Sequence, residues 1–381
     1  MPQKLLFVTA NDQYFCSHRL SLAIAAQKAG FIVAVATQIN HHKNLIEAYG
    51  IKIFNLRFLH RSSMQPLKEI AALYELFTIY RDFKPNIVHH VAMKPVMYGA
   101  LMAKCCRVPK TINALTGLGY LFTSANNTKQ SFMQNYKRKI IRYIVCKLFA
   151  YLLNDKNSKT IFQNPDDIQT LLHHGCINVK QAVLIRGSGV DPTIFRPVAF
   201  KTTFPVHCIF AARMLWDKGV GELIEAIRII KQHNKDAQFY FYGTPDLANP
   251  ASIPESSLIA WQKQGLIVWQ GYQADMINAY KDAHIAILPS YREGLPKFLL
   301  EAASCGLPLI ATDVAGCREI VHDGKNGFLV PLQDVNTLAE KILILINNEA
   351  LRISMGQHSR WLVETQFADT IIHKTILELY L

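Results

Sequence analysis

Residues 4–37 read KLLFVTANDQYFCSHRLSLAIAAQKAGFIVAVAT, a short apolar run, a stretch with apolar residues at helical spacing, and a second apolar run. The runs at 4–9 and 31–37 have the composition of buried strands. The segment 17–30 between them ends on Gly30, a residue that commonly follows a helix. A strand, a helix and a strand in this order predict a parallel sheet with the helix packed on one face.

The same alternation continues through both halves of the chain. In the first half, we expect strands at 51–56, 86–92 and 110–116, the last of the series, and helices at 66–82 and 95–108. The pattern starts again after residue 205, with strands at 206–214, 237–243, 266–272, 284–289, 307–313 and 328–331, and helices at 221–234, 297–305 and 334–347. The sequence therefore predicts an α/β fold of two Rossmann-like, doubly wound parallel-sheet domains in tandem.

The expected domains are 1–195 and 196–365, followed by a C-terminal helix at 366–381. The segment IFRPVAFKTTFP (194–205) has two prolines and no clear periodicity, as expected of a linker. Two such domains facing one another leave a cleft between them. Because open α/β sheets bind ligands beyond the carboxyl ends of their strands, we expect the site in the loops that follow the strands.

Charge is distributed unevenly along the 381 residues. Residues 1–190 hold 24 Lys and Arg against 8 Asp and Glu, a net charge of +16. Residues 191–381 hold 17 against 20, a net charge of −3, which together give the +13 of the whole chain. A basic half implies an anionic partner such as nucleic acid, acidic lipid or a phosphorylated substrate. A composition that is 50% hydrophobic and 18% charged excludes intrinsic disorder.

The sequence contains no recognisable targeting or metal-binding signal. No run of about 18 uncharged apolar residues predicts a spanning helix, and the N-terminal residues read as a first strand, not as a signal peptide. These features favour a cytoplasmic protein. The eight cysteines form no CxxC pair and no Asp-x-Asp occurs. We therefore expect neither a metal site nor a required cofactor.

Two carboxylates stand out in SYREGLPKFLLEAASCGLPLIATDVAGCREIVHDGKNGFLVP (290–331). Glu293 falls in the loop after an expected strand, and Glu301 falls inside the next helix, about two turns further on. Carboxylates at these two depths suit the hydroxyl pairs of sugars and riboses. Between them, Gly294, Leu295, Pro296 and Lys297 form a turn at a helix start, where backbone N–H groups favour a diphosphate.

This segment resembles the nucleotide-sugar signature of the family-four retaining glycosyltransferases, which have the two-Rossmann GT-B architecture. Their hallmark is Glu, seven residues, Glu, here Glu293 to Glu301. The resemblance implies that the first Glu contacts the donor sugar, the second binds the ribose, and the intervening amides hold phosphate. It also implies that the helix at 366–381 crosses back to the first domain. The match continues through Gly306-Leu307-Pro308, Gly316, Glu319 and the turn at 323–328.

Two further segments resemble motifs of the same family. AARMLWDKG (211–219) resembles the strand-end motif in which an Arg and a Lys, here Arg213 and Lys218, neutralise the departing diphosphate. Preorganised cations stabilise the charge that a leaving nucleoside diphosphate develops. RGSGVD (186–191) resembles the glycine-rich turn at the end of the first domain, which implies that Gly187 and Gly189 let the backbone approach the donor. Tyr272, after a glycine, is our candidate contact for the nucleotide base.

The first domain should hold the acceptor. Its first loop, TANDQYFCSHR, departs from the family because it contains no glycine, so we expect acceptor contacts from Ser17, His18 and Arg19. Many relatives carry a His after the strand that ends near residue 115, where this chain has no His, so no catalytic base is assigned. The later strands contribute the acceptor candidates His90, Lys94, Thr116 and Gly117.

The stretch KQSFMQNYKRKIIRYIVCKLFAYLL (129–153) combines cations with aromatic and aliphatic residues and contains no acid. A helix with this composition suits the surface of an anionic membrane. The alternative is a long amphipathic helix that packs on the first domain and points its lysines to water. The candidate membrane contacts are Lys137, Arg138, Lys139 and Arg142.

The segments HHVAMKPVMYGA, INALTGLGYLF and GSGVD most resemble the branch that extends undecaprenyl-diphosphate-linked sugars in O-antigen, capsule or glycan assembly. The resemblance implies transfer of a hexose or N-acetylhexosamine from a nucleotide sugar, UDP-linked by expectation, to a lipid-diphosphate-linked sugar at the inner face of the plasma membrane. One alternative is a UDP-sugar 2-epimerase of the same architecture, and another is a glycosyltransferase with a soluble acceptor. A nucleic-acid-binding protein is disfavoured, because the chain lacks a recognised nucleic-acid motif.

Overall fold

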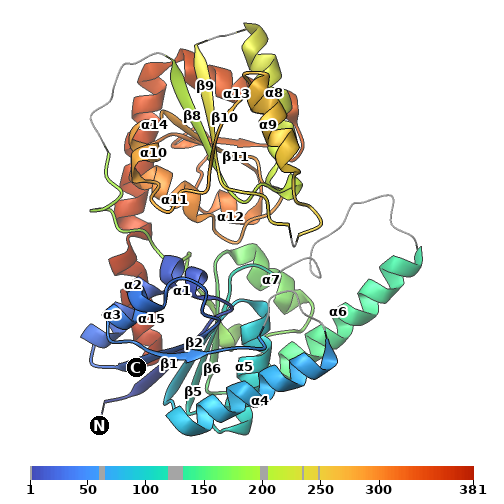
Figure 1. Ribbon diagram of the computed structural model, residues 1–381, viewed down its shortest axis with the longest axis vertical. Helices are drawn as coiled ribbons and strands as arrows, with labels where there is room; N and C mark the ends of the chain where they lie inside the picture. Colours follow the sequence, from blue (N-terminus) through green and yellow to red (C-terminus); the bar gives the residue numbers. More distant parts are fainter. Residues whose placement is uncertain (1, 60–64, 119–131, 198–204, 234–235, 248) are drawn as a thin grey trace. The chain divides into compact units, whose positions relative to one another are not determined.

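The computed structural model describes residues 2–59, 65–118, 132–197, 205–233, 236–247 and 249–381, with only the backbone described between 132 and 140. The chain forms two compact units, each built on one sheet (Figure 1). The first unit comprises Met1–Ser188 and Ile372–Leu381, and the second comprises Gly189–Ile371. All the strand pairs within the two sheets are parallel, as the sequence predicts.

The first unit has a seven-stranded sheet in the order β3-β2-β1-β4-β5-β6-β7. The order reverses beside β1, so the loops after β1 and β4 leave the sheet at a topological switch point, where ligands bind in open α/β sheets. The strands are β1 (Lys4–Val8), β2 (Ile32–Thr37), β3 (Lys52–Asn55), β4 (Ile87–Val91), β5 (Lys110–Leu115), β6 (Ser158–Phe162) and β7 (Ala182–Leu184).

Helices cover both faces of this sheet. Apolar residues of α2 and α15 pack on one face with β1 and β2, whereas those of α4 and α5 pack on the other face. On that second face, α4 and α6 both pack against α5. The helices are α1 (Asp12–His18), α2 (Leu20–Lys28), α3 (Lys43–Ala48), α4 (Pro66–Phe83), α5 (Met93–Cys105), α6 (Phe132–Leu153), α7 (Pro165–His173) and α15 (Asp369–Tyr380). None of the helices in the described residues has the length and apolar composition needed to cross a bilayer.

The first unit has two short helices, α3 and α7, that the sequence analysis did not predict, and it differs from the prediction at the first helix and at the end of the sheet. The helix expected over 17–30 is divided into α1 and α2 at Arg19, whose backbone leaves the helical region. The earlier start of α1 follows from Asn11, whose side chain accepts a hydrogen bond from the Tyr14 amide and caps the helix. The sheet also continues beyond β5, the last strand expected. β6 begins with the polar residues Ser158, Lys159 and Thr160, and β7 has only three residues, so neither gives a strand signal.

The second unit has a six-stranded sheet in the order β10-β9-β8-β11-β12-β13. Its core is one continuous cluster of buried apolar residues contributed by the strands and by the helices on both faces. The strands are β8 (Val206–Ala211), β9 (Ala237–Tyr242), β10 (Val268–Gly271), β11 (Ile285–Leu288), β12 (Leu309–Thr312) and β13 (Gly327–Val330). The helices are α8 (Val220–His233), α9 (Glu255–Lys263), α10 (Ile277–Lys281), α11 (Lys297–Ser304), α12 (Ala315–Arg318), α13 (Val335–Asn347) and α14 (Glu349–Leu362).

The C-terminal helix α15 begins in the second unit, and its residues from Ile372 belong to the first unit. Ile372, Ile376 and Tyr380 are buried in the core of the first unit. The Tyr380 hydroxyl forms a hydrogen bond with Nδ1 of the buried His89 in β4, and Lys110 Nζ donates to the Tyr380 carbonyl. Apolar packing and these polar contacts therefore fix the last turns of α15 to the sheet of the first unit.

We predict that Tyr380→Phe destabilises the first unit by about 1–3 kcal/mol, because it leaves a buried nitrogen of His89 without a partner. Hydrogen exchange of the β4 amides under increasing denaturant measures this loss. Tyr151→Phe is the matched control, since the Tyr151 side chain is exposed on α6. Equal protection in both variants would contradict the proposed anchoring role of the Tyr380 hydroxyl.

Candidate active site

The loops that follow β8 and β11 bring together the main site residues predicted in the second unit. β8 and β11 are neighbours in the sheet, so their carboxyl ends lie side by side. The loop after β8 holds Arg213 and passes into a short 3-10 helix, Trp216–Lys218, which ends on Lys218. The loop after β11 holds Glu293 and leads into α11. The fold therefore places both predicted cations and the first carboxylate at one edge of the sheet.

Lys218 and Glu293 form an ion pair between these two loops. Lys218 Nζ lies 2.6 Å from Glu293 Oε1, and the two side chains are only 19% and 13% exposed. The loops are also joined through their backbones, because the Tyr291 amide donates to the Asp217 carbonyl at 2.9 Å. A charge pair that is this sheltered from water is weakly screened, so it holds the carboxylate in one position.

The loop carrying Glu293 contacts the last residue of β12 and the short helix α12 that follows this strand. Thr312 Oγ1 donates a hydrogen bond to the Ser290 carbonyl. Gly316 lies so close that a Cβ atom there would meet the carbonyl oxygens of Gly294 and Glu293 at 2.4 and 2.6 Å. Only glycine fits this close approach, which explains physically why the sequence motif has a glycine at position 316.

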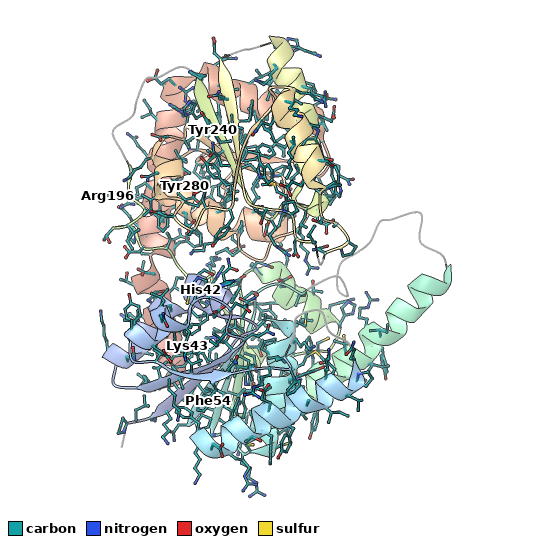
Figure 2. The ribbon with its side chains drawn as sticks, in the orientation of Figure 1. His42, Lys43, Phe54, Arg196, Tyr240 and Tyr280 are labelled. Atoms are coloured by element: carbon teal, nitrogen blue, oxygen red, sulfur yellow. The ribbon has the colours of Figure 1, made fainter. Side chains whose placement is uncertain are left out.

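Glu301 is a buried carboxylate with two partners. It lies in α11 and is 8% exposed, and its Oε2 accepts a 2.8 Å hydrogen bond from the hydroxyl of Tyr280 in α10. Tyr280 is labelled in Figure 2. Its Oε1 lies 3.1 Å from Lys297 Nζ, one helical turn away. Burial beside this carboxylate raises the pKa of Tyr280 well above its usual value, so the hydroxyl stays protonated and donates. The two partners orient Glu301.

Arg213 is paired with a residue that the sequence analysis did not single out. Its Nη1 lies 2.6 Å from Oδ2 of Asp246, which belongs to the loop after β9. Both side chains are partly exposed, at 42% and 30%. Tyr272 follows β10 with 58% of its side chain exposed, an accessible aromatic surface at the same edge of the sheet. Among the described residues, no group of His, Cys, Asp and Glu side chains could hold a metal ion.

Two family models match the chain in succession. A model described as "Glycosyl transferase 4-like" matches residues 4–164, and one described as "Glycosyl transferases group 1" matches residues 205–348. The chain belongs to the glycosyltransferases of the GT-B fold.

Similar proteins include two bacterial enzymes whose names state their acceptors. The glycosyltransferase is 25% identical over 344 residues to the N,N'-diacetylbacillosaminyl-diphospho-undecaprenol alpha-1,3-N-acetylgalactosaminyltransferase of Campylobacter jejuni, covering 87% of this chain and 86% of the relative. It is 23% identical over 304 residues to the UDP-Gal:alpha-D-GlcNAc-diphosphoundecaprenol alpha-1,3-galactosyltransferase of Escherichia coli, covering 75% and 73%.

Solved structures share the fold of this glycosyltransferase. The sucrose-phosphate synthase of Thermosynechococcus elongatus has a TM-score of 0.76 at 19% identity and covers 99% of this chain and 98% of its own. Anabaena HepE, crystallised with UDP and glucose, has the same TM-score at 16% identity and the same coverage. At these identities the likeness supports the GT-B fold alone.

The glycine-rich turn of the glycosyltransferase lies where the two units divide. Gly187 and Gly189 both have a φ of 76°, which favours glycine. A Cβ at Gly189 would lie 2.5 Å from the Cα of Asp369, so the backbone of the second unit passes directly against it. Val190 then pairs with Ala368 as an isolated parallel bridge. Gly189 therefore has a packing role in the structure, and the donor contact of both glycines stays a prediction.

Of the acceptor candidates on α1 and at its end, Ser17 and His18 are accessible and Arg19 is not. Ser17 is exposed, and its Oγ lies 2.6 Å from Nδ1 of His18, whose ring stacks on Tyr14. Arg19 is only 3% exposed, and its Nη1 donates to the His18 carbonyl. Arg19 can therefore affect a ligand only by supporting its neighbours.

The candidates that follow the other strands have different surroundings. His90 is fully buried between the Tyr80 hydroxyl and the Asn113 side chain, and burial lowers the pKa of its imidazole to about 4. Lys94 lies 2.7 Å from Glu69 Oε2 and is 19% exposed. Thr116 and Gly117 follow β5 and are half-buried.

The predicted membrane contacts lie in or near the part of α6 that is least described. Lys137, Arg138 and Lys139 lie in this helix, but their side chains are outside the described residues. Arg142 is half-buried. On the described part of the helix, Ile141, Ile144 and Tyr151 are 50–60% exposed, and Tyr143 is 64% exposed.

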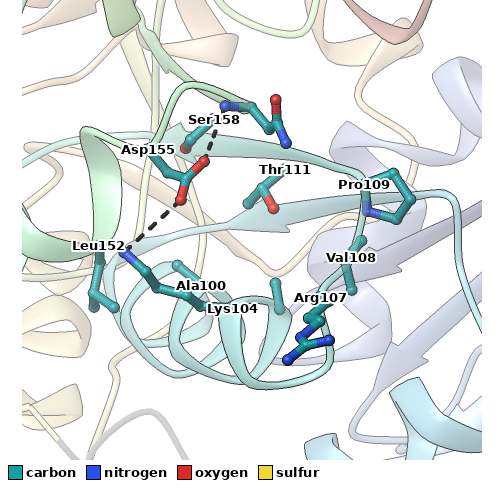
Figure 3. Close-up of a pocket in the computed structure, with 11 residues that line it drawn as sticks. Ala100, Lys104, Arg107, Val108, Pro109, Thr111, Leu152, Asp155 and Ser158 are labelled. Carbon is teal, nitrogen blue, oxygen red and sulfur yellow. Dashed lines mark hydrogen bonds and ion pairs between the residues drawn. The ribbon is translucent and has the colours of Figure 1, made fainter.

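A pocket in the first unit is separate from these residues (Figure 3). It lies at the amino ends of β5 and β6, where Thr111 and Ser158 line it together with Lys104, Arg107 and Asp155. Lys104 Nζ and Asp155 Oδ2 are 3.8 Å apart, a weak pair of partly exposed charges. Because ligands of open α/β sheets bind at the carboxyl ends of the strands, we do not include this pocket in the active site.

We predict that Gly316→Ala lowers the rate of sugar transfer by about a hundredfold, because the added methyl group displaces the backbone at Glu293 and Gly294. Gly221→Ala is the control, since a Cβ there makes only ordinary contacts with Trp216, at 3.4 Å or more. Initial rates and thermal melting are measured for both variants. A Gly316→Ala protein with wild-type activity would show that the loop tolerates displacement.

Proposed function

We propose that the chain is a retaining glycosyltransferase that moves a hexose or an N-acetylhexosamine from a UDP-sugar to a sugar linked to a lipid diphosphate. The observation that carries the proposal is the pairing of Lys218 with Glu293 beside Arg213, at the carboxyl ends of two neighbouring strands. This arrangement presents two cations and a sugar-binding carboxylate to one ligand. A nucleotide sugar has the complementary groups, a diphosphate and the hydroxyls of a hexose.

In this proposal each donor-site residue has a distinct task. Arg213 binds the diphosphate through its planar guanidinium, and Lys218 adds a point charge where the leaving group gains negative charge. Glu293 accepts hydrogen bonds from the donor sugar. Glu301, oriented by Tyr280, accepts hydrogen bonds from the ribose hydroxyls.

The remaining donor contacts come from the start of α11 and from the end of β10. The loop enters α11 at Lys297, directly after Pro296, which has no N–H group. The backbone amides there are those of Gly294, Leu295 and Lys297, and the helix dipole favours a phosphate at this end. Tyr272 offers its exposed ring to the base. The Escherichia coli relative is named for UDP-Gal, which supports a uridine nucleotide as the donor.

The acceptor proposal depends on the relatives and on the first unit. The Campylobacter jejuni and Escherichia coli relatives are named for acting on diphospho-undecaprenol-linked sugars, which supports an acceptor of that class. The candidate acceptor contacts in the first unit are Ser17 and His18 on α1, Thr116 and Gly117 after β5, and Lys94 in the first turn of α5.

A lipid-linked acceptor requires the enzyme to work at a membrane surface, and we propose the inner face of the plasma membrane. The exposed apolar residues of α6 accompany the cations around Arg142, a combination that suits an anionic interface. α4, which packs against α5 as α6 does, adds exposed Leu67, Ile70 and Tyr74 at helical spacing. These residues extend the surface available to lipid.

The proposed function is tested by transfer of label from UDP- and GDP-sugars to a short-chain polyprenyl-diphosphate sugar, counted in the organic phase. We expect one UDP-sugar to label the lipid, with the anomeric configuration of the donor retained in the product. Label that stays on an isomerised nucleotide would instead identify a UDP-sugar 2-epimerase. Label that moves only to a water-soluble sugar would contradict the lipid acceptor.

We predict that Glu293→Gln lowers the rate of transfer by about 10²–10³-fold, because the site loses a charge that acts in the transition state. Thermal stability should change far less than activity. Glu340→Gln serves as the control, because it removes an exposed carboxylate from α13 in the same unit. Full activity of the Glu293→Gln variant would remove this residue from the donor site.

We predict that neutralising Lys137, Arg138 and Lys139 together reduces sedimentation of the protein with anionic vesicles, since each surface cation contributes on the order of 1 kcal/mol of attraction. The charge-matched control neutralises Lys231, Lys263 and Lys325 of the second unit. Unchanged sedimentation of the first variant, or an equal loss in both, would contradict a specific membrane contact at α6.

A further inference from the structure

Arg213 forms an ion pair with Asp246, a residue to which the proposed function assigns no task. Arg213 is a proposed diphosphate ligand, yet its guanidinium is held 2.6 Å from a carboxylate. In the same site Lys218 is paired with Glu293, and Lys297 with Glu301. The three cations of the site are therefore each matched by a carboxylate. A diphosphate must compete with one of these internal anions for each cation that it binds.

Asp246 is fixed in place by the backbone around it. Its loop runs alongside the segment that carries Arg213, through an isolated bridge between Met214 and Pro245 and another between Leu215 and Ser252. The Asn249 amide donates to the Asp246 carbonyl at 2.8 Å, which closes the turn. These backbone contacts keep the Asp246 carboxylate within reach of Arg213.

The Arg213–Asp246 ion pair is more exposed to solvent than the Lys218–Glu293 pair, so a ligand breaks it more easily. The Arg213–Asp246 pair is 42% and 30% exposed, whereas the Lys218–Glu293 pair is 19% and 13% exposed. Solvent screens the more exposed pair and leaves it a small net stabilisation. A diphosphate offers Arg213 more negative charge and a bidentate geometry, so it displaces Asp246 readily.

We propose that Asp246 is an internal competitor of the diphosphate, a positioning residue that occupies Arg213 in the empty site and reclaims it when the nucleoside diphosphate leaves. This inference rests on the donor site of the proposed function. Asp246 thereby weakens binding of the product diphosphate and speeds its release. Asp246 belongs to the segment GTPDLANP (243–250), in the loop that follows β9.

The test compares UDP binding to wild-type protein and to Asp246→Asn by calorimetry at low and high salt. We expect the variant to bind UDP about fivefold more tightly at low salt, since a screened ion pair of this kind is worth up to about a factor of five. The gain should shrink at high salt. Uridine, which has no phosphate, should bind both proteins equally.

Matched variants separate the pairing from a general change in charge. Glu225→Gln removes a carboxylate that is paired with an Arg on α8 and should leave UDP binding unchanged. In the Arg213→Gln background the gain from Asp246→Asn should disappear, as expected for two residues that act through one contact. Asp246→Glu, which keeps the charge, should restore binding close to that of the wild type.

The outcomes distinguish this inference from the proposed function. Unchanged or weaker UDP binding by Asp246→Asn, with normal binding by the wild type, overturns the competitor role and leaves the donor site standing. A gain that persists without Arg213 also overturns it, because Asp246 would then act on UDP directly. Failure of the wild type to bind UDP or GDP overturns the proposed donor site and this inference with it.

Discussion

The ion pair between Lys218 and Glu293 joins two loops that are distant in sequence, and the rest of the candidate site is arranged around it. The pair forms because β8 and β11 are neighbours in a parallel sheet, which places the two loop starts side by side. Partial burial makes the pair strong enough to hold the carboxylate still. Gly316 supports the loop that carries Glu293, because without a Cβ it lets the backbone of α12 approach the Glu293 and Gly294 carbonyls.

The same edge of the sheet balances its charges internally. Arg213, Lys218 and Lys297 each have a carboxylate partner, and these ion pairs hold the side chains of the site in position. Preorganisation of this kind lowers the cost of orienting cations when the ligand arrives. The affinity for a diphosphate then depends on its competition with these carboxylates for the cations. The more exposed an ion pair is, the more easily the diphosphate breaks it.

The fold and the core of this site could be predicted from the sequence, because their signals are local. Alternating apolar runs and helical segments indicate the parallel sheets, and the spacing from Glu293 to Glu301 places both residues correctly on a loop and the following helix. The role of Tyr280 as the partner of Glu301 had no local signal, because an α10 residue meets an α11 residue only in the folded core. Asp246 was missed for the same reason.

On the acceptor side, sequence position was a poorer guide to accessibility. His90 lies in β4, a central strand that is buried along its whole length under helices on both faces, so the side chain is enclosed by Tyr80 and Asn113. Arg19 is buried because α1 and α2 meet at it. A strand end in the sequence marks the edge of the sheet, whereas the direction of each side chain depends on register and on the neighbouring helices.

We expect the loops after β8 and β11 to form a single diphosphate-binding site in the second unit. Hydrogen–deuterium exchange with and without saturating UDP tests it most directly, since it reports on both loops in one experiment. We expect UDP to slow the exchange of backbone amides at 213–218 and at 290–301, with little change in β2 and β3 of the first unit. Protection confined to the first unit, or protection of one loop without the other, would contradict a site built on the Lys218–Glu293 pair.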